Sequence, residues 1–391
     1  MTTGIARKKK FVIASDSFKA CLTAKQACDA FELGIMQIYP DSIIVKVPMA
    51  DGGEGTVQAL VDATGGRKVA KVVTGPLGTP VTAEYGILGD GKTGVIEMAS
   101  ASGIEYLKES EKNPLVTTTF GTGELIKDCL DHQISKIIIG IGGSATNDGG
   151  CGMASALGVR FLDKNGLELP RGGGGLRDLD RIDTTELDPR VKNSQLIIAS
   201  DVLIPLYGIN GASEMFGPQK GADDATVKLL DNYLKHYGDV IQRDLGKDVA
   251  LRPGAGAAGG LGAGLFSIFE YSLRSGVDII IEYTDLEKKL VDADYCFTGE
   301  GRIDFQTEFG KTPYGVAKMA KSVNSRITVI GVSGSIGKNI SNLYTNAFDA
   351  IFSITPGPSD LETLLQDGQE NIIKACENIC RLIKSVEFAK N

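Results

Sequence analysis

Charged and hydroxyl side chains stand directly after short apolar runs in this sequence, in loops rich in glycine. The clearest example is Lys136 to Gly150, KIIIGIGGSATNDGG, in which isoleucines lead into such a loop. Runs of this kind predict strands buried on both faces of a parallel sheet. Open α/β sheets bind ligands at the carboxyl ends of their strands, where glycine lets the backbone approach a ligand closely. The chemistry available there is anion binding by amides and cations, and metal binding by carboxylates.

The same pattern repeats along the chain. SDSFK follows the apolar run Phe11 to Ala14, ADGGEGT follows Ile43 to Val47, and TGEGRID follows Tyr295 to Phe297. A helix is expected after the first of these loops, because Thr23 and Gln26 have the spacing of a capping box. Strands that alternate with helices in this way predict an α/β fold with a parallel sheet.

The length of 391 residues predicts two domains. From Arg67 onwards the sequence becomes rich in threonine and valine with turns at glycine and proline, which is typical of β-structure. The last third returns to alternating strands and helices. We therefore predict a doubly wound domain formed by residues 1–67 and 285–391, with an unstructured extension before Phe11. A large inserted α/β domain at residues 68–284 interrupts it.

Composition argues against several classes of function. The net charge of -8 and the pI near 5.1 disfavour a nucleic-acid partner. The first apolar run is too short for a signal segment or a membrane span, so we expect a cytoplasmic protein without membrane association. The two histidines, His132 and His236, disfavour hydrolases that need a histidine base. The seven cysteines lack metal-binding spacing and are expected to be reduced thiols.

Two glycine patterns invite a nucleotide-binding interpretation. GAGAAGG, which begins at Gly254, has dinucleotide spacing but follows no strand, and GIGGSA, which begins at Gly140, follows a strand but shows no clear helix start. A nicotinamide-dependent (NAD) dehydrogenase therefore stays an alternative. FGKTP is not a Walker A loop, because Phe305 stands where the first glycine is required. A nucleotide, if bound, is bound outside the P-loop class.

The motifs SDSFK, MADGGEGT, GIGGSATNDGG, GPQKGA, GAGAAGG and TGEGRID, in this order, resemble those of the bacterial glycerate kinases of the first family, which includes glycerate 2-kinases. The resemblance extends from Phe11 to about Thr355. It implies ATP-dependent phosphorylation of D-glycerate. The implied fold is α/β, with a Rossmann-like doubly wound parallel sheet interrupted by a large inserted α/β domain. The chain departs from the family pattern at four positions. It has Ser15, Ala20, Ser200 and Ile204 where the family has Pro, Gly, Cys and Asn, respectively.

Phosphoryl transfer needs cations, backbone amides and carboxylate-held magnesium, and it does not need a histidine. We assign catalysis to Lys19, Asp201, Arg302 and Asp304. Magnesium (Mg2+) is expected on Asp201, Glu300 and Asp304. Binding of ATP is assigned to Gly142, Gly143, Ser144, Thr146, Asn147, Gly256, Gly259 and Lys311. Binding of glycerate is assigned to Asp16, Ser17, Asp51, Gly52, Gly53 and Glu54.

Within these sets, Lys19 is expected to contact glycerate or the γ-phosphate, and Arg302 to clamp a carboxylate or phosphate with two hydrogen bonds. The alternative for Arg302 is a structural ion pair with a neighbour such as Glu300. The resemblance favours 2-phosphoglycerate as product. Because residue types do not distinguish two hydroxyls on adjacent carbons, 3-phosphoglycerate stays open. A non-catalytic organic-acid binder is the remaining alternative.

Overall fold

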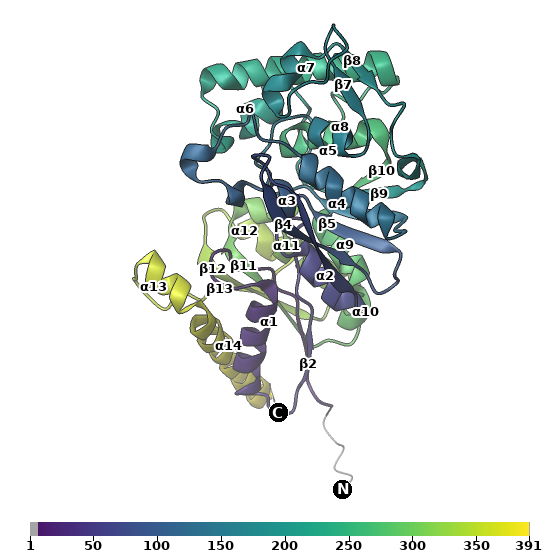
Figure 1. Cartoon of the computed structure of the whole chain (residues 1–391). Coiled ribbons are helices and arrows are strands. Elements are labelled where there is room, and N and C mark those ends of the chain that lie inside the picture. The colour runs from purple at the N-terminus through teal and green to yellow at the C-terminus, as the bar shows by residue number, and fades with distance from the viewer. Residues whose placement is uncertain (1–6, 391) are drawn as a thin grey trace. The chain divides into compact units, whose positions relative to one another are not determined.

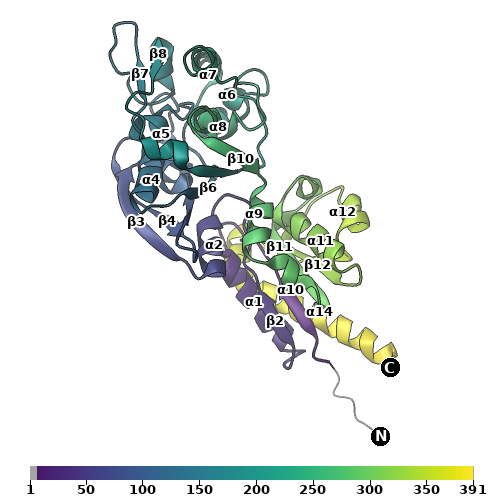
Figure 2. The same cartoon turned by 90° about the vertical axis from the view of Figure 1, so that its right-hand side faces the viewer.

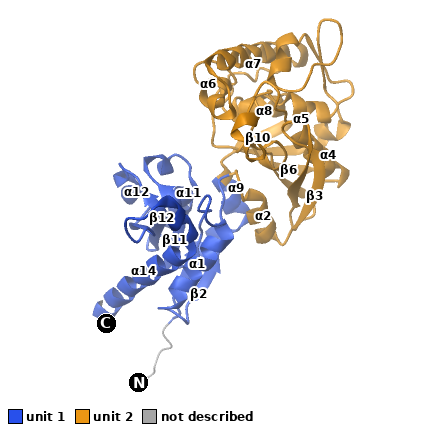
Figure 3. Ribbon diagram, turned by 60° about the vertical axis from the view of Figure 1, so that its left-hand side comes forward, with its two compact units in different colours: residues 1–51, 277–391 blue, residues 52–276 orange. Residues whose placement is uncertain are grey.

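The structure is a computed structural model that describes residues 7–390, and the chain divides into two compact units (Figure 3). Unit 1 combines the two ends of the chain, up to Asp51 and from Val277 onwards, and unit 2 is Gly52–Gly276. Residues 1–6 of the predicted N-terminal extension lie outside the described residues. Within the described part of the chain, no helix is both long enough and apolar enough to span a membrane.

Unit 1 is built on a sheet of five parallel strands in the order β2, β1, β11, β12, β13. The strands are β1 (Lys10–Ile13), β2 (Ile43–Lys46), β11 (Tyr295–Ile303), β12 (Thr328–Ile336) and β13 (Ala350–Ser353). Counted within the unit, this order is 2-1-3-4-5, which is one of the common doubly wound orders. The predicted α/β fold with a doubly wound parallel sheet is confirmed. The direction of winding reverses between β1 and β11.

Helices cover both faces of the unit 1 sheet (Figures 1 and 2). They are α1 (Ala24–Met36), α9 (Gly276–Tyr283), α10 (Leu286–Leu290), α11 (Thr312–Val323), α12 (Ser341–Asn346), α13 (Leu361–Gln366) and α14 (Gly368–Lys390). Helices α1 and α14 lie side by side, and they approach closely at Gly34, where a β-carbon would meet the Ile373 carbonyl oxygen at 2.6 Å. Phe11, Phe31 and Phe297 lie in the core between these helices and the sheet.

Unit 2 contains a mixed sheet of six strands in the order β10, β9, β6, β5, β4, β3. The strands are β3 (Arg67–Thr74), β4 (Pro80–Ile87), β5 (Thr93–Glu97), β6 (Lys136–Gly140), β9 (Gln195–Ala199) and β10 (Glu270–Arg274). Strands β5, β6, β9 and β10 are parallel, and β3 and β4 add an antiparallel edge. A second, two-stranded sheet pairs β7 (Arg160–Leu162) with β8 (Arg181–Asp183). The threonine- and valine-rich segment after Arg67 thus forms the antiparallel edge.

The helices of unit 2 surround this sheet and bury a separate core. They are α2 (Thr56–Thr64), α3 (Ala99–Ser102), α4 (Phe120–Asp131), α5 (Cys151–Ala156), α6 (Ala212–Phe216), α7 (Asp224–Leu245) and α8 (Ala257–Ile268). Ile137 and Ile139 of β6 and Leu196 and Ile198 of β9 are fully buried in this core. The two parallel strands that precede the predicted ligand loops of unit 2 are therefore held rigidly by packing.

The boundaries between the units fall after Asp51 and before Val277, whereas the sequence places them after residues 67 and 284. The packing of two helices explains the difference. Helix α2 packs against β3, β4 and β5 of unit 2. Helix α9 belongs to unit 1, because its Val277 packs closely against Gly315 of α11. A β-carbon on Gly315 would lie 2.5 Å from Val277 Cγ1.

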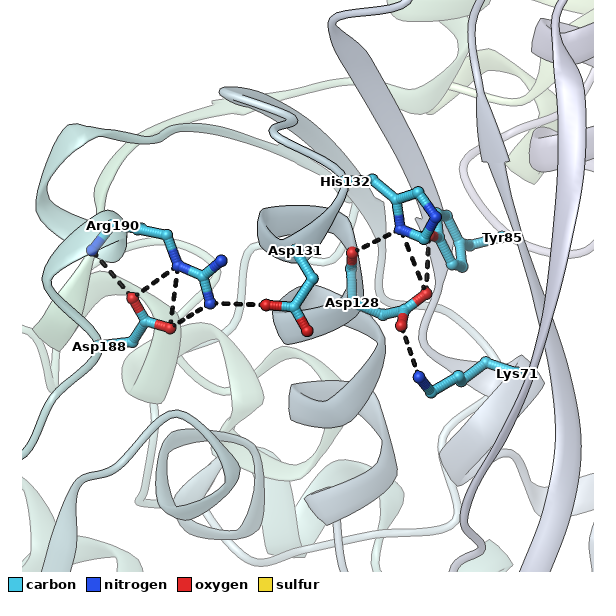
Figure 4. Close-up of polar contacts among 7 residues, drawn as sticks. All are labelled: Lys71, Tyr85, Asp128, Asp131, His132, Asp188 and Arg190. Atoms are coloured by element: carbon cyan, nitrogen blue, oxygen red, sulfur yellow. Dashed lines mark hydrogen bonds and ion pairs between the residues drawn. The ribbon is translucent and has the colours of Figure 1, made fainter.

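Polar side chains anchor helix α4 to its neighbours in unit 2 (Figure 4). The Asp128 carboxylate accepts hydrogen bonds from Lys71 Nζ at 2.7 Å and from the Tyr85 hydroxyl at 2.9 Å. Burial alone would raise the pKa of Asp128, but these two bonds outweigh it and hold the pKa below its usual value. A second group of ion pairs joins Asp131, Asp188 and Arg190. Both groups are structural, since they connect β3, β4 and the segment before β9 to one helix.

Candidate active site

A cavity of about 450 Å³ lies at the carboxyl edge of the unit 1 sheet. The polar part of its wall consists of Asp16, Ser17, Lys19, Asp51, Glu300, Arg302 and Lys311. The apolar part consists of Phe18, Cys21, Ile354, Leu361, Leu364 and Leu365. Asp51 follows β2, and Lys311 directly precedes α11. Asp16, Ser17 and Lys19 come from the loop after β1, and Glu300 and Arg302 from the end of β11, the two strands between which the winding reverses. Doubly wound sheets bind their ligands at this point.

The loop after β1 reaches the cavity because it stays hydrogen-bonded to β11. Asp16 N donates to the Gly299 carbonyl at 2.9 Å, and Ser15 Oγ donates to the same oxygen at 3.1 Å. The loop then turns at Ala20, whose φ of 60° lies in the left-handed region that favours glycine. Lys19, directly before this turn, is exposed and lines the cavity. The structure thus brings the predicted Asp16 and Lys19 into one wall.

Asp16 is buried, and its carboxylate is held from two sides. Thr312 Oγ1 donates to Oδ2 at 2.6 Å, and Ser17 N donates to Oδ1 at 2.6 Å. Burial and the nearby Asp51 carboxylate nevertheless raise the pKa of Asp16 to about 6. A carboxyl group with such a pKa exchanges its proton near neutral pH, which suits a proton acceptor.

Glu300 lies in the same wall and interacts with Asp16. Lys311 Nζ lies 3.4 Å from Glu300 Oε1, and Thr307 Oγ1 donates to the same oxygen at 3.3 Å. Burial raises the pKa of Glu300 to about 7, the Lys311 charge opposes this rise, and the Asp16 charge adds to it. The two acids therefore titrate as an interacting pair close to neutral pH.

Arg302 pairs with Asp304 and not with Glu300. Arg302 Nε donates to Asp304 Oδ2 at 3.0 Å. The other oxygen of Asp304 accepts from Gln306 N at 3.0 Å and caps a short 3₁₀ helix, Phe305–Glu308. Within residues 7–390 the guanidinium hydrogen-bonds through Nε alone, and the Arg302 side chain is 66% exposed. Asp304 thus shapes the loop, and the Nη groups of Arg302 can bind an anion in the cavity.

Several predicted residues of unit 2 come together at the carboxyl edge of β6 and β9. A β-carbon on Gly140 would meet the Gly52 carbonyl oxygen at 2.2 Å, and one on Gly142 would meet Gly53 Cα at 3.4 Å. Glycine is therefore required at Gly140, whereas the contact at Gly142 leaves room for a β-carbon. The exposed members of this group are Glu54, Gly142, Gly143 and Asp201.

The rest of the predicted nucleotide loop is buried within unit 2. Ser144 is 8% exposed, and Thr146 and Asn147 are 0% exposed. The buried Lys220 donates to Ser144 Oγ at 2.8 Å and to the Thr146 carbonyl at 2.7 Å. Burial lowers the pKa of Lys220 to about 7. Thr146 Oγ1 and Asn147 Oδ1 have no hydrogen-bond partner within the described residues, so a binding role for this loop stays a prediction.

Gly256 and Gly259, at the start of α8, are buried against other backbone. A β-carbon on Gly256 would meet the Pro205 carbonyl oxygen at 2.0 Å, and one on Gly259 would meet the Thr146 carbonyl oxygen at 2.0 Å. This glycine run follows no strand and is packed against protein. It gives no support to the dehydrogenase alternative, since a dinucleotide fingerprint leaves its backbone open to the pyrophosphate.

The three carboxylates predicted to hold magnesium are divided between the units. Asp201 belongs to unit 2, whereas Glu300 and Asp304 belong to unit 1, and of these three only Glu300 lines the cavity. Among residues 7–390, no group of three or more acidic, histidine or cysteine side chains is arranged to hold a metal. Magnesium in nucleotide sites is typically held by one or two carboxylates together with phosphate oxygens. The cavity fits that kind of site and does not fit an all-protein one.

Sequence analysis does not single out three residues that the structure places at these sites. Thr312 donates a hydrogen bond to Asp16. It follows the lysine of FGKTP, and that motif gives no indication of a contact with the loop after β1. Lys220, which organises the unit 2 loop, stands in GPQKGA, where its burial has no signal in the sequence. Asn371 lines the cavity from α14, far from every glycine-rich loop.

An α/β fold whose switch-point cavity combines lysine, arginine and carboxylates has the parts that a phosphotransferase needs. The sequence matches the glycerate kinase family over residues 11–384. The chain therefore belongs to the glycerate kinase family and is a kinase. The family resemblance read from the motifs is confirmed.

Individual relatives agree with this assignment. The chain is 49% identical over 375 residues to the glycerate kinase of Bacillus subtilis, which covers 96% of this chain and 98% of the relative. It is 48% identical over 370 residues to the glycerate 2-kinase of Escherichia coli, which covers 95% and 97%. A crystal structure of a protein described as glycerate kinase 2 from Salmonella typhimurium has a TM-score of 0.87 and 46% sequence identity, and the match covers 97% of this chain and 100% of that chain.

Proposed function

We propose that this protein transfers the γ-phosphoryl group of ATP to a hydroxyl of D-glycerate, and that the cavity of unit 1 is where its charged groups act. The observation that carries the proposal is the meeting of Lys19, Arg302 and Lys311 with Asp16 and Glu300 in one wall at the switch point of the sheet. The family of the chain supports the same reaction. In a protein of net charge -8, such a local group of cations is needed to attract two anionic substrates.

The cations act on charge that develops in the transition state. Lys19 and Lys311 neutralise phosphate oxygens as point charges, and Lys311 stands directly before α11, whose amino end adds positive potential. Arg302 uses its Nη groups to hold the glycerate carboxylate or a phosphate bidentately, while Asp304 fixes the guanidinium through Nε. Positioning and charge neutralisation of this kind account for most of the catalysis of phosphoryl transfer.

A carboxylate accepts the proton of the attacking hydroxyl. Asp16 and Glu300 are the candidates, because their pKa values of about 6 and about 7 lie close to neutral pH. At pH 7 a carboxyl group with a pKa of about 6 is largely ionised and one with a pKa of about 7 is about half ionised, and both bind the released proton well. The two acids repel each other, so protonation of one makes ionisation of the other easier.

Magnesium fits the cavity as an ion that arrives with ATP. Glu300 is the carboxylate that would hold it there, together with phosphate oxygens of the nucleotide. The ion supplies neutralisation of phosphate charge when it is bound. The roles predicted for Asp201 and for the exposed glycines of unit 2 are retained as part of this proposal.

The product we propose is 2-phosphoglycerate, since one close relative is described as a glycerate 2-kinase. The test is ADP release from magnesium, ATP and D-glycerate, followed by addition of enolase without phosphoglycerate mutase. Formation of phosphoenolpyruvate identifies the 2-isomer, and its absence together with ADP release identifies the 3-isomer. No ADP above a control without glycerate, from folded protein, contradicts the kinase proposal and leaves a non-catalytic binder.

A further inference from the structure

The unit 1 cavity extends beyond the charged residues that phosphoryl transfer uses. It continues past Gly334 and Ser335 at the end of β12 to Ile354 and Thr355 after β13. Because β11, β12 and β13 are neighbours in the sheet, the far end lies two strands beyond β11. Strands are spaced by about 4.8 Å, so this end is roughly 10 Å from the strand that carries Glu300. Glycerate is too small to fill both ends, whereas ribose and phosphates span such a distance in a nucleotide.

An apolar helix face that the protein itself leaves uncovered lines the cavity from its far end back to the loop after β1, where Cys21 Sγ donates to the Leu365 carbonyl at 3.1 Å. Leu361, Leu364 and Leu365 of α13 line the cavity, and no residue of this helix is buried. Leu361 is 71% exposed. Phe18 of the loop after β1 and Ile354 after β13 are buried and complete the apolar wall. An exposed apolar surface at a cavity wall is typical of a ligand site, and a flat aromatic ring is the kind of ligand that such a slot holds.

One polar group, the side-chain amide of Asn371, is set in this apolar end. Asn371 is 7% exposed and lines the cavity from the first turns of α14. Among the described residues, no group hydrogen-bonds to its side chain, although its backbone N–H donates to the Asp367 carbonyl at 2.9 Å. The amide atoms are not among the fully buried atoms that lack a partner, so they are open to the cavity and can pair with a ligand there. An amide carries a donor beside an acceptor, so its partner should present an acceptor beside a donor.

We propose that this apolar end is the adenine subsite of the kinase, with α13 covering one face of the ring and Asn371 recognising its edge. Adenine presents an amino donor beside a ring-nitrogen acceptor, and asparagine pairs with this edge through two hydrogen bonds. Guanine has a carbonyl oxygen in place of the amino group, so an amide oriented for adenine would face it acceptor to acceptor, and guanine pairs only with the amide turned over. The subsite therefore favours ATP over GTP when the cavity holds the amide in the adenine orientation. This inference rests on the proposed function, in which ATP is the phosphoryl donor.

The experiment compares two cavity variants with two matched controls in the full chain. Asn371→Leu fills the same space without the amide, and Leu361→Ser removes apolar surface from an exposed position, so that folding is not at risk. Asn342→Ala, on the exposed side of α12, and Leu382→Ser, 58% exposed on α14, are the controls because neither lines the cavity. The measured quantities are KM for ATP, KM for glycerate, and the ratio of kcat/KM for ATP to that for GTP.

We expect KM for ATP to rise at least about tenfold in Asn371→Leu, because a bidentate amide–adenine pair is lost. The preference for ATP over GTP should narrow in the same variant, and KM for glycerate should stay within twofold. Leu361→Ser should raise KM for ATP without changing the ATP/GTP ratio. Unchanged KM for ATP in both variants, in an enzyme that still phosphorylates glycerate, overturns the subsite and leaves the proposed function standing.

If the wild-type protein releases no ADP in the presence of glycerate, the proposed function fails, and the subsite is then judged by calorimetric titration of the same proteins with ADP. Binding to the wild type that is weakened in Asn371→Leu but not in Asn342→Ala supports the subsite. Equal binding to all four variants, or no binding to the wild type, overturns it.

Discussion

The carboxyl edges of the two sheets have similar glycine-rich sequences, but their polar side chains are placed differently. In unit 1, Asp16, Lys19 and Glu300 line a cavity, and burial outweighs the hydrogen bonds to both acids and raises their pKa values to about 6 and about 7. In unit 2, Lys220 and Ser144 are buried and hydrogen-bond to each other at 2.8 Å. The first arrangement leaves charge available to a ligand, and the second uses it to hold a loop.

This difference shows that an acid with a shifted pKa is a candidate functional group only where a ligand has access to it. Burial raises the pKa of Asp148 in unit 2 as well, yet its carboxylate accepts bonds from Thr119 N at 2.8 Å and Oγ1 at 2.9 Å and is 0% exposed. Asp128 is the opposite case, a buried acid whose partners lower its pKa (Figure 4). Perturbed acids mark functional sites only when a ligand can reach them.

The strongest test of the comparison is Asp304→Asn in unit 1, since Asp304 both caps a helix and fixes Arg302. Asparagine is an equally good cap, so the loop should stay folded, whereas the ion pair with Arg302 is lost. We expect kcat to fall about a hundredfold, which corresponds to about 2.7 kcal/mol, with an unchanged melting temperature. Steady-state kinetics with ATP and glycerate measure the effect.

The matched control for Asp304→Asn is Asp223→Asn. Asp223 caps α7 in unit 2 by accepting from Thr226 N at 2.8 Å, and it is exposed. Its substitution should change neither kcat nor stability. Near-normal turnover in Asp304→Asn would show that the charge of this loop is structural, as it is in unit 2.

The second test is the pH dependence of stability in Lys220→Met. The pKa of Lys220 is about 7 in the folded protein and near 10.5 when unfolded, so between these values the unfolded chain binds the extra proton and wild-type stability rises with pH. Relative to the variant, the wild type should gain up to about 2 kcal/mol between pH 7 and pH 8.5. Urea titrations at both pH values measure it, with the exposed Lys228→Met as control. A constant difference contradicts a neutral, buried Lys220.

The sequence predicts the α/β fold and one of these two regions well. Apolar runs followed by polar loops identify β1, β2, β6 and β11, and the rule for doubly wound sheets brings Asp16, Lys19 and Glu300 to one edge. Such runs do not identify β10. The sequence does not separate a glycine in an exposed loop, such as Gly142, from one that packs against backbone, such as Gly256. That distinction depends on long-range packing, which local sequence does not encode.

The same limit explains the residues that sequence reasoning missed. Asn371 and the leucines of α13 have the pattern of an amphipathic C-terminal helix, in which polar and apolar residues alternate at helical spacing and no glycine-rich loop follows an apolar run. The sequence does not predict the unit boundary at Asp51 either, because α2 follows β2 in the chain but packs on the sheet of unit 2. Both outcomes are set by which sheet a helix covers, and helix periodicity alone does not reveal it.

A smaller effect separates an ion pair with a buried carboxylate from an ion pair with an exposed one, both formed by lysines of β3 in unit 2. Lys71→Met removes the partner of Asp128, whose side chain is 7% exposed, whereas Lys68→Met removes that of Glu84, which is 53% exposed. We expect Lys71→Met to lower the free energy of unfolding by about 1 kcal/mol at pH 7 and Lys68→Met by roughly 0.3 kcal/mol or less.

The Lys71 effect should also depend on pH, because its bond lowers the pKa of Asp128. The stabilisation is present above the unfolded pKa near 3.8 and is lost as the pH falls through the lower folded value. Thermal unfolding between pH 3 and pH 7 therefore separates the two lysines. Equal losses for both variants at pH 7 would contradict the structural role of the Asp128 network.

The smallest effect concerns the loop that carries Lys19 into the unit 1 cavity. Ala20 has a φ of 60°, which costs a residue with a β-carbon roughly 1–2 kcal/mol, and Ala20 is exposed, so its methyl group contributes little packing. Glycine avoids this strain but loses about 0.5–1 kcal/mol more conformational entropy on folding. Ala20→Gly should therefore raise the free energy of unfolding by about 0.5 kcal/mol.

The control is the same substitution at Ala375, within α14. It should lower the free energy of unfolding by about 1 kcal/mol, because the backbone is helical there. Urea unfolding of the two variants beside the wild type measures both signs, and a loss of stability in Ala20→Gly would show that this turn is not strained.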